Sequence, residues 1–444
     1  MAAEFKKAFI SVPKRSQLLR CSSKRIIILT ALSLSLFSFF TFPRWLQLSQ
    51  LLSYRQLSFL DNPAQSAPLP PLKFKRDGTF QLSIFSDLHF GENAWESWGP
   101  RQDVESIRVI NTVLDTEPAT DLVVLNGDLI TGENVFRHNG SEYVDVIAQA
   151  LSARGVTWGS AYGNHDSDRN LSPTEMFERE KGYRGSRTGR MVSGEEGEVG
   201  VTNYYLPVWS WDGKRVEMVL WFFDSRGGFR FQEEVGRENW VHPKVVGWFR
   251  ETNERLKREY GGRRVPGLGF VHIPTTAFLE VQEEAGVGGR KRPGINADVP
   301  VSRQGGGWCD DGTDGEGCEY GGQDRDFMEA VMETEGLVGL FVGHDHGDTW
   351  CSDYAKKERK VFLCFGQHTG YGGYGNWIRG SRQVGVSVEG LDLGEMDTWV
   401  RLENGKVVGK VRLNPTYGGD EYENVEDEKT HLPVDGESAD TVEE

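Results

Sequence analysis

The 444-residue sequence lacks an excess of basic charge, and this limits the partners we expect. It contains 50 lysine and arginine residues against 66 aspartate and glutamate residues, a formal net charge of −16 at pH 7. Stable binding of nucleic acid requires a basic patch, so we expect no nucleic-acid partner. Phosphate chemistry stays open, because bound metal ions supply positive charge locally. Internal repeats are absent too, which leaves one large domain or two modest ones at this length.

Long apolar runs are scarce, and the one near the N-terminus extends from Ile26 to Phe42, where Pro43 and Arg44 close it. Its 17 residues are at the lower limit for a membrane-spanning helix, and no clear small-x-small cleavage site follows. Basic residues precede it and favour a cytosolic N-terminus. We predict a basic cytosolic leader (1–25), a transmembrane signal anchor (26–42) and a stem (43–73). The rest of the chain then faces a secretory or vacuolar lumen or the cell exterior.

Cysteine is also rare, with five residues in the chain. By the predicted topology Cys21 is cytosolic, and the other four form an even set in an oxidising compartment. Spacing alone does not choose among the three possible pairings, and four buried free thiols are the alternative. Our prediction is two local disulfides, Cys309–Cys318 and Cys351–Cys364. In the same compartment, Asn139 and Asn170 stand in N-glycosylation tripeptides.

Apolar, strand-like runs recur along the chain from residue 74 onward. Helical periodicity over 104–117 and 143–154 separates the first three runs, and this βαβ pattern predicts a mainly parallel sheet in the first half. The later segments 384–388 and 399–413 alternate without helices, which predicts antiparallel strands with Asn404 and Gly405 as a two-residue hairpin turn. The predicted earlier strands are Phe80–Ser86, Asp121–Asn126, Val156–Tyr162, Val216–Asp224, Gly267–Ile273, Leu337–Gly343 and Val361–Gly366.

Two segments show neither period. Residues 280–323 are rich in glycine and charge, and we expect loops near the mouth of the site or partial disorder there. The tail from Asp420 to Glu444 is strongly acidic, and we expect a solvated, disordered end beyond a domain that covers residues 74–413.

Metal-ligand residue types follow several of the predicted strands. Aspartate, the asparagine carbonyl and neutral imidazole suit Zn, Mn or Fe better than Ca alone or a thiolate-bound metal. A bridging carboxylate such as Asp128 holds two ions about 3.5–4 Å apart, the spacing that clamps phosphate esters for hydrolysis. Each motif alone is more often structural, but their order after successive strands favours one site. The motifs are Asp87-x-His89, Gly127-Asp128, Gly163-Asn164-His165-Asp166, His272 and Gly343-His344-x-His346.

In this order the motifs resemble those of the calcineurin-like metallophosphoesterase superfamily. The residues within and beside the motifs resemble those of its purple-acid-phosphatase-related low-molecular-weight group of plants and fungi. The resemblance implies an α/β (α+β mixed) fold, a four-layer sandwich of two mixed β-sheets flanked by helices. It also implies a proton donor at His165, oriented by Asp166. The implied ligands of one metal are Asp87, His89, Asp128 and His346, and those of the other are Asp128, Asn164, His272 and His344.

Two positions depart from the purple enzymes of that family. They carry a tyrosine three residues after the Gly-Asp aspartate, where its phenolate binds ferric iron, whereas this chain has Thr131 there. They also carry glycine where this chain has His89. The resemblance therefore favours two divalent ions, Mn, Zn or Fe, over a purple ferric centre.

The predicted function is hydrolysis of a phosphorylated substrate, a phosphoprotein or small phosphate ester, by attack of metal-bound hydroxide with His165 as general acid. One alternative is a phosphodiesterase acting on lipid- or glycolipid-linked phosphate, for which a membrane anchor would be convenient. The other is a catalytically silent scaffold with the same fold. Two readings stay open nearby: His368 either lines the pocket or is a loop histidine, and Tyr371, Tyr374 and Trp377 either form a substrate wall or pack against the sheet edge.

Overall fold

The computed structural model describes residues 69–432, except for 286–287, 295–298 and 308–319. The predicted leader, the predicted anchor and the predicted pair Cys309–Cys318 lie outside the described residues. Within the described part, none of the helices combines the length and apolar character that crossing a membrane requires.

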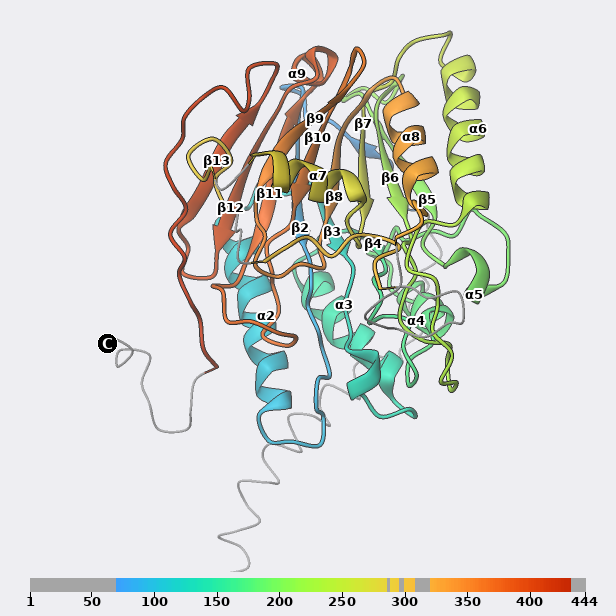
Figure 1. Ribbon diagram of the computed structural model, residues 1–444, viewed down its shortest axis with the longest axis vertical. Coiled ribbons are helices and arrows are strands. Elements are labelled where there is room, and N and C mark those ends of the chain that lie inside the picture. Colours follow the sequence, from blue (N-terminus) through green and yellow to red (C-terminus); the bar gives the residue numbers. More distant parts are fainter. Residues whose placement is uncertain (1–68, 286–287, 295–298, 308–319, 433–444) are drawn as a thin grey trace, which may run out of the picture. The chain divides into compact units, whose positions relative to one another are not determined.

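One of two mixed sheets is six-stranded, in the order β13-β12-β11-β2-β3-β4 (Figure 1). Strand β2 pairs parallel with β3, and β3 pairs parallel with β4, while α2 and α3 connect these strands. The predicted βαβ pattern is therefore confirmed. The bounds are β2 (Thr79–Phe85), α2 (Gly99–Thr116), β3 (Leu122–Asn126), α3 (Tyr143–Ala153), β4 (Trp158–Ala161), β11 (Gly380–Ser387), β12 (Met396–Leu402) and β13 (Val407–Leu413).

The late strands are antiparallel, as predicted. The hairpin between β12 and β13 is longer than the predicted two-residue turn, because residues 403–406 separate the strands. The backbone N–H of Leu402 donates to the carbonyl of Lys406 at 3.0 Å, and Gly405 adopts a φ of 81° inside this loop. Asn404 and Gly405 thus lie in the turn as predicted, but the loop contains four residues rather than two.

The second sheet is seven-stranded, in the order β1-β5-β6-β7-β8-β10-β9. Its centre, from β6 to β10, is parallel, and the antiparallel strands β5 and β9 lie toward its two edges. The two-residue β1 extends the sheet just before residue 74, where we placed the start of the domain. The bounds are β1 (Leu72–Lys73), β5 (Tyr204–Trp209), β6 (Val216–Phe223), β7 (Gly267–Val271), β8 (Leu337–Val342), β9 (Cys351–Lys356) and β10 (Arg359–Phe365).

Three buried clusters show how the layers stack. The cluster between the sheets joins Leu82 of β2 to Phe222 of β6 and Phe341 of β8, so the two sheets pack face to face. A second cluster lies under α2 and α3 on the outer face of the six-stranded sheet. The third lies under α6, α7 and α8 on the outer face of the other sheet. The expected order of helices, sheet, sheet and helices is present. The remaining helices are η2 (Gly132–Asn134), η3 (Gly140–Glu142), α4 (Pro173–Glu180), α5 (Glu196–Val199), α6 (Pro243–Glu259), α7 (Thr276–Ala285), α8 (Arg325–Glu333) and α9 (Val388–Leu393).

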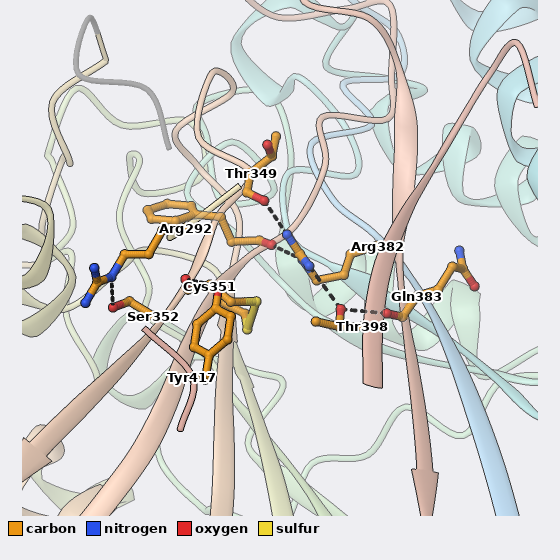
Figure 2. The surroundings of a disulfide bond; sticks show 10 residues. Arg292, Thr349, Cys351, Ser352, Arg382, Gln383, Thr398 and Tyr417 are labelled. Atoms are coloured by element: carbon orange, nitrogen blue, oxygen red, sulfur yellow. Dashed lines mark hydrogen bonds between the residues drawn. A yellow bond between two sulfur atoms is a disulfide. The ribbon is translucent and has the colours of Figure 1, made fainter. Parts of the chain in front are cut away.

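A disulfide joins Cys351 of β9 to Cys364 of β10, directly opposite each other in the sheet, and confirms the prediction for this pair (Figure 2). Beside it, the buried guanidinium of Arg382 from β11 donates to the carbonyl of Phe365 and to Oγ1 of Thr398, the latter at 2.9 Å. Because these residues come from β10, β11 and β12, polar contacts tie the two sheets together near the carboxyl ends of β8 and β10, next to the strand ends that carry the motifs.

Residues 420–432 are exposed or partly exposed, as expected of a solvated end, but they differ from a disordered tail in pairing with the domain. The N–H of Ile378 donates to the carbonyl of Glu428 at 3.0 Å, and the N–H of Thr430 donates to the carbonyl of Asn376 at 2.7 Å. These bonds form an antiparallel bridge between Trp377 and the tail. The glycine-rich insert also contacts the domain at residue 304, where the amide nitrogen of the buried Gln304 donates to the carbonyl of Ile273, next to His272.

Candidate metal centre

The predicted ligands follow the carboxyl ends of strands in both sheets. Parallel strands place their carboxyl ends at one edge, which is where ligand sites form in such sheets. The two sheets pack with these edges together, so the loops of one sheet meet those of the other. Asp87 and His89 follow β2, Asp128 follows β3, Asn164 follows β4, His272 follows β7, and His344 and His346 follow β8.

Four of these ligands adopt left-handed backbone conformations. The φ angles are 57° for Asp87, 49° for His89, 50° for Asp128 and 75° for His344. Aspartate, asparagine and histidine are the non-glycine residues most often found there. Backbone strain of this kind gathers at functional sites, where the turn aims the side chain. Glycine is required beside them, since a Cβ on Gly127 would lie 2.2 Å from Nδ1 of His272.

Group A, which we define as Asp87, His89 and His346, brings one ligand atom of each residue within 4.8 Å of the others. The Nε2 atoms of His89 and His346 are 3.2 Å apart. Nδ1 of His346 donates to the carbonyl of Tyr374 at 2.8 Å, which leaves Nε2 with its lone pair toward the group. Nδ1 of His89 forms a hydrogen bond of 3.0 Å with Oγ1 of Thr131. Burial lowers the pKa of His89 to about 3, so this imidazole is neutral, the form that binds metal.

Group B consists of Asp128, His272 and His344, whose ligand atoms also lie within 4.8 Å of one another. Nδ1 of His272 donates to the carbonyl of Asn126 at 2.9 Å, and its Nε2 is 2.8 Å from Oδ2 of Asp128. Burial disfavours the charged form of His272, but the Asp128 carboxylate outweighs this and raises the pKa of His272 to about 9. A cation bound to group B would therefore replace a proton.

Asp128 connects the two groups. Its Oδ2 lies 3.8 Å from Nε2 of His89 in group A as well as beside His272. Asn164 adjoins group B through its neighbour His165, whose N–H donates to Oδ1 of Asp128 at 2.9 Å. The amide oxygen of Asn164 is buried and has no hydrogen-bond partner among the described residues. A buried acceptor needs a partner, and a metal ion bound at group B would supply one to this oxygen.

These residues fit two divalent ions. The donor set consists of carboxylate oxygens, neutral imidazole nitrogens and an amide oxygen, which suits Mn, Zn or Fe. Backbone carbonyls fix the tautomer of His346 and of His272, as expected for metal-binding histidines. The structure thus brings six predicted ligands into two groups and places Asn164 beside the second.

His165 lies at the open side of the site, with about a third of its side chain exposed. We expected Asp166 to orient it, but the carboxylate of Asp166 is buried and accepts the backbone N–H groups of Gly163, Leu129 and Ile130. Adjacent side chains point apart here, so Asp166 shapes the loop instead. The orienting contact comes from Glu133, whose Oε1 is 2.7 Å from Nδ1 of His165.

The charges around His165 favour its protonated form. Burial opposes protonation, but the carboxylates of Asp128 and Glu133 outweigh it and raise the pKa of His165 to about 10. With Nδ1 facing Glu133, Nε2 is the nitrogen available to donate a proton to a bound substrate. The loop that carries Glu133 is fastened by Asn170, whose amide nitrogen donates to the carbonyls of Glu133 and Val135. This use of the amide argues against Asn170 as a glycosylation site.

The motif analysis missed the role of Tyr374. Its ring stacks on the imidazole of His346, with ring centroids 4.0 Å apart and an interplanar angle of 8°. The hydroxyl accepts the N–H of His346 at 3.0 Å and donates to the carbonyl of His344 at 3.3 Å. Tyr371 is instead buried against Glu403, which confirms the packing interpretation for that residue.

His368 is buried and packs on His346, with ring centroids 3.8 Å apart, and its Nε2 donates to the carbonyl of Gly372 at 3.1 Å. It lies behind group A and supports the loop that carries Tyr374. Neither His368 nor Tyr374 stands in a motif with a recognisable spacing, and a tyrosine among glycines was the only signal for the latter.

Comparisons with known proteins identify the family of the chain and several similar proteins. The family described as calcineurin-like phosphoesterase matches residues 82–348, more than half of the chain. The chain is 25% identical over 399 residues to "Probable inactive purple acid phosphatase 29" of Arabidopsis thaliana, covering 83% of this chain and 92% of that protein. It is 22% identical over 373 residues to "Probable inactive purple acid phosphatase 28" of the same plant, covering 76% and 84%. Among solved structures, a dimetal phosphatase from Danio rerio is similar over 76% of this chain and 98% of that one, with 13% identity and a TM-score of 0.45.

Proposed function

Since this chain belongs to the calcineurin-like phosphoesterase family, we propose that it is a metal-dependent phosphatase that hydrolyses phosphomonoesters. The observation that carries the proposal is the convergence of groups A and B on the shared carboxylate of Asp128, with His165 beside them. Group A would hold one divalent ion and group B, with Asn164, the other. When bound, the two ions would supply positive charge to the phosphoryl oxygens and lower the pKa of a water molecule.

The residues of the chain account for the rest of the reaction. His165 donates a proton from Nε2 to the departing alcohol oxygen, and Glu133 holds the ring and keeps it protonated until that step. Asp166 keeps the loop from residue 163 to 166 closed around Asp128 through its bonds to the backbone. The substrate is a phosphorylated molecule of which the leaving group meets the open side of the site. The lumenal location and the membrane anchor remain predictions.

The names of the two plant relatives favour a second candidate, a scaffold without catalysis. Against this, the present chain carries both ligand groups and the Glu133–His165 pair. Thr131 replaces the family's iron-binding tyrosine but does not leave a gap, because its hydroxyl supports the extra ligand His89. A chain can lack the purple ferric centre and still keep a dinuclear centre. The geometry here supports the lack of the ferric centre and does not support the lack of a dinuclear centre.

The test uses the full chain, stripped of metal and reconstituted with Mn, Zn or Fe singly. Turnover of p-nitrophenyl phosphate and of its bis ester is measured, with Asp128→Asn as the control. Metal-dependent turnover of the mono ester that disappears in Asp128→Asn is the expected result. Preference for the bis ester would replace the phosphatase by a phosphodiesterase, and folded, metal-loaded protein without turnover on either ester would favour the scaffold.

A further inference from the structure

The acidic segment 420–432, which we call the strap, lies against the loop that orients a metal ligand. Residues 370–378, the Tyr374 loop, form its partner. Two backbone hydrogen bonds join them around Trp377, whose indole also receives the ammonium group of Lys429 at 4.7 Å from the ring centroid. An exposed polar segment is stable in water without these contacts, so their presence indicates a local role that explains them.

Side-chain contacts fasten the strap on both sides of the bridge. Oγ1 of Thr430 donates to Oε1 of Glu403 at 2.7 Å, and Lys406 pairs with Glu428 at 2.9 Å. Leu432 packs against the cluster under α2 and α3. Glu403 in turn binds Arg108 of α2 and the hydroxyl of Tyr371 at the start of the Tyr374 loop. The strap is therefore tied to the folded body, and an exposed ion pair is only one of several attachments.

The Tyr374 loop passes this restraint to His346. Tyr374 makes three contacts with the His344–His346 segment: its carbonyl binds Nδ1 of His346, its ring stacks on that imidazole, and its hydroxyl bridges the backbone. The loop also lies very close to the ligands, since a Cβ on Gly373 would lie 2.5 Å from Cε1 of His346. The indole of Trp377 lies against Gly347, the next residue along, where a Cβ would meet it at 2.7 Å.

We propose that the strap is a positioning element for the metal ligand His346, acting through Trp377 and Tyr374. The His346 ring of group A depends on it, whereas the His272 ring of group B is held by the carbonyl of Asn126 at the end of β3. The proposal rests on the proposed function in that the groups must bind metal. Residues that orient a metal ligand typically change metal affinity by about 10- to 100-fold when they are removed.

The test compares chains that end at residue 419 and at residue 432. The second lacks only the residues beyond the strap and is the matched control. Mn²⁺ alone is titrated against a competing chelating dye to count the ions and measure each affinity. Hydrogen exchange of the His346 amide is followed in the metal-free chains. We expect removal of the strap to weaken one of two Mn²⁺ ions by about tenfold or more, to leave the other unchanged and to speed exchange at His346.

Two point variants keep the test decisive if the shortened chain fails to fold. The double change Lys429→Ala, Thr430→Val loosens the strap, and Tyr374→Phe removes the hydroxyl bridge while keeping the ring. The double change should weaken the group A ion alone, and Tyr374→Phe should weaken that ion most, since its hydroxyl also contacts the carbonyl of His344 in group B. Glu423→Gln in the same segment should change the affinity of neither ion. If the Mn²⁺ affinities and the hydrogen exchange of the His346 amide are unchanged in folded variants, the strap does not position His346. A full chain that binds no Mn²⁺ would overturn both the proposed function and the positioning role of the strap. A full chain that binds two ions without turnover would overturn only the proposed function.

Discussion

Groups A and B contain similar ligands but are supported differently. In group B, the ring of His272 is fixed by the carbonyl of Asn126, the last residue of β3, so the support is the buried sheet itself. In group A, the rings of His89 and His346 are fixed by Thr131 and Tyr374, which lie in loops. Surface loops open more easily than buried strands. The comparison teaches that a buried strand fixes the His272 ring of group B, whereas loop residues, the buried Thr131 and the exposed Tyr374, fix the two rings of group A.

The largest effect is expected from Asp128→Asn, which should weaken the ions of both groups and so remove the difference in affinity between them. Its carboxylate lies between the groups, so both ions should bind weakly and turnover should fall by roughly a thousandfold. Metal counting and kcat with p-nitrophenyl phosphate measure this. Asp121→Asn, immediately before β3 at its other end, is the control and should change neither. Two ions bound with normal affinity in Asp128→Asn would show that the groups do not share a ligand.

The next largest effect separates chemistry from metal binding. His165→Ala removes the proton donor but keeps the backbone N–H that binds Asp128. We expect kcat to fall by about a hundredfold or more, with both Mn²⁺ affinities within a factor of about two of the parent. A substrate whose leaving group needs no proton should lose less. An equal loss for all leaving groups would contradict a general-acid role.

A smaller effect is expected in the pH profile of Glu133→Gln. The carboxylate of Glu133 raises the pKa of His165, and the reaction needs the protonated ring, so activity is lost as the pH rises through that pKa. Without the charge, the pKa falls and the alkaline limb of kcat against pH should move to lower pH by about one unit or more. The acidic limb should stay in place. A profile that moves to higher pH would reverse the assignment.

The variant Thr131→Val tests directly whether groups A and B are supported independently. It removes the hydroxyl that is hydrogen-bonded to Nδ1 of His89 and nearly keeps the shape of the side chain. We expect the affinity of the group A ion to fall by about tenfold and the group B ion to be unaffected. Titration with Mn²⁺ against a chelating dye resolves the two. Equal weakening of both ions would mean that the groups are not supported independently.

Opening the disulfide should have the smallest effect on activity. The double change Cys351→Ser, Cys364→Ser removes a link across 13 residues between β9 and β10, which carry none of the proposed ligands, and should lower the free energy of unfolding by about 3 kcal/mol. Denaturant unfolding measures this, and metal affinities should not change. A selective loss of the group A ion would show that β9 and β10 also support His346.

The sequence predicted the central strands well because parallel strands buried on both faces appear as continuous apolar runs. All residues of β3 and of β6 are buried, and both were located to within a residue. The edge strands β4 and β13 of the six-stranded sheet lie within predicted segments, but β1 and β9 at the edges of the other sheet were not found. Strand β9 reads Cys351-Ser-Asp-Tyr-Ala-Lys356 and is half exposed, and β1 has only two residues. Their conformation comes from the neighbouring strand rather than from their own composition.

The ligands were predictable for a related reason, since each stands directly after a strand that the sequence shows. The residues that orient them were not. Tyr374 reaches His346 and Glu133 reaches His165 across gaps that depend on how loops fold. Asp166 was assigned to His165 because the two are adjacent, yet adjacency does not fix direction, and Asp166 turns toward backbone amides. Tertiary contacts between loops leave no periodic signal in the chain.

The left-handed turns at Asp87, His89, Asp128 and His344 set ligand chemistry against folding stability. A glycine at any of them would remove a ligand and relieve backbone strain of about 1 kcal/mol or more. A descendant released from metal binding should therefore gain robustness by drifting to glycine at these turns. Aspartate and histidine occupy all four places, so the strained turns carry the residue types that the proposed metal centre needs.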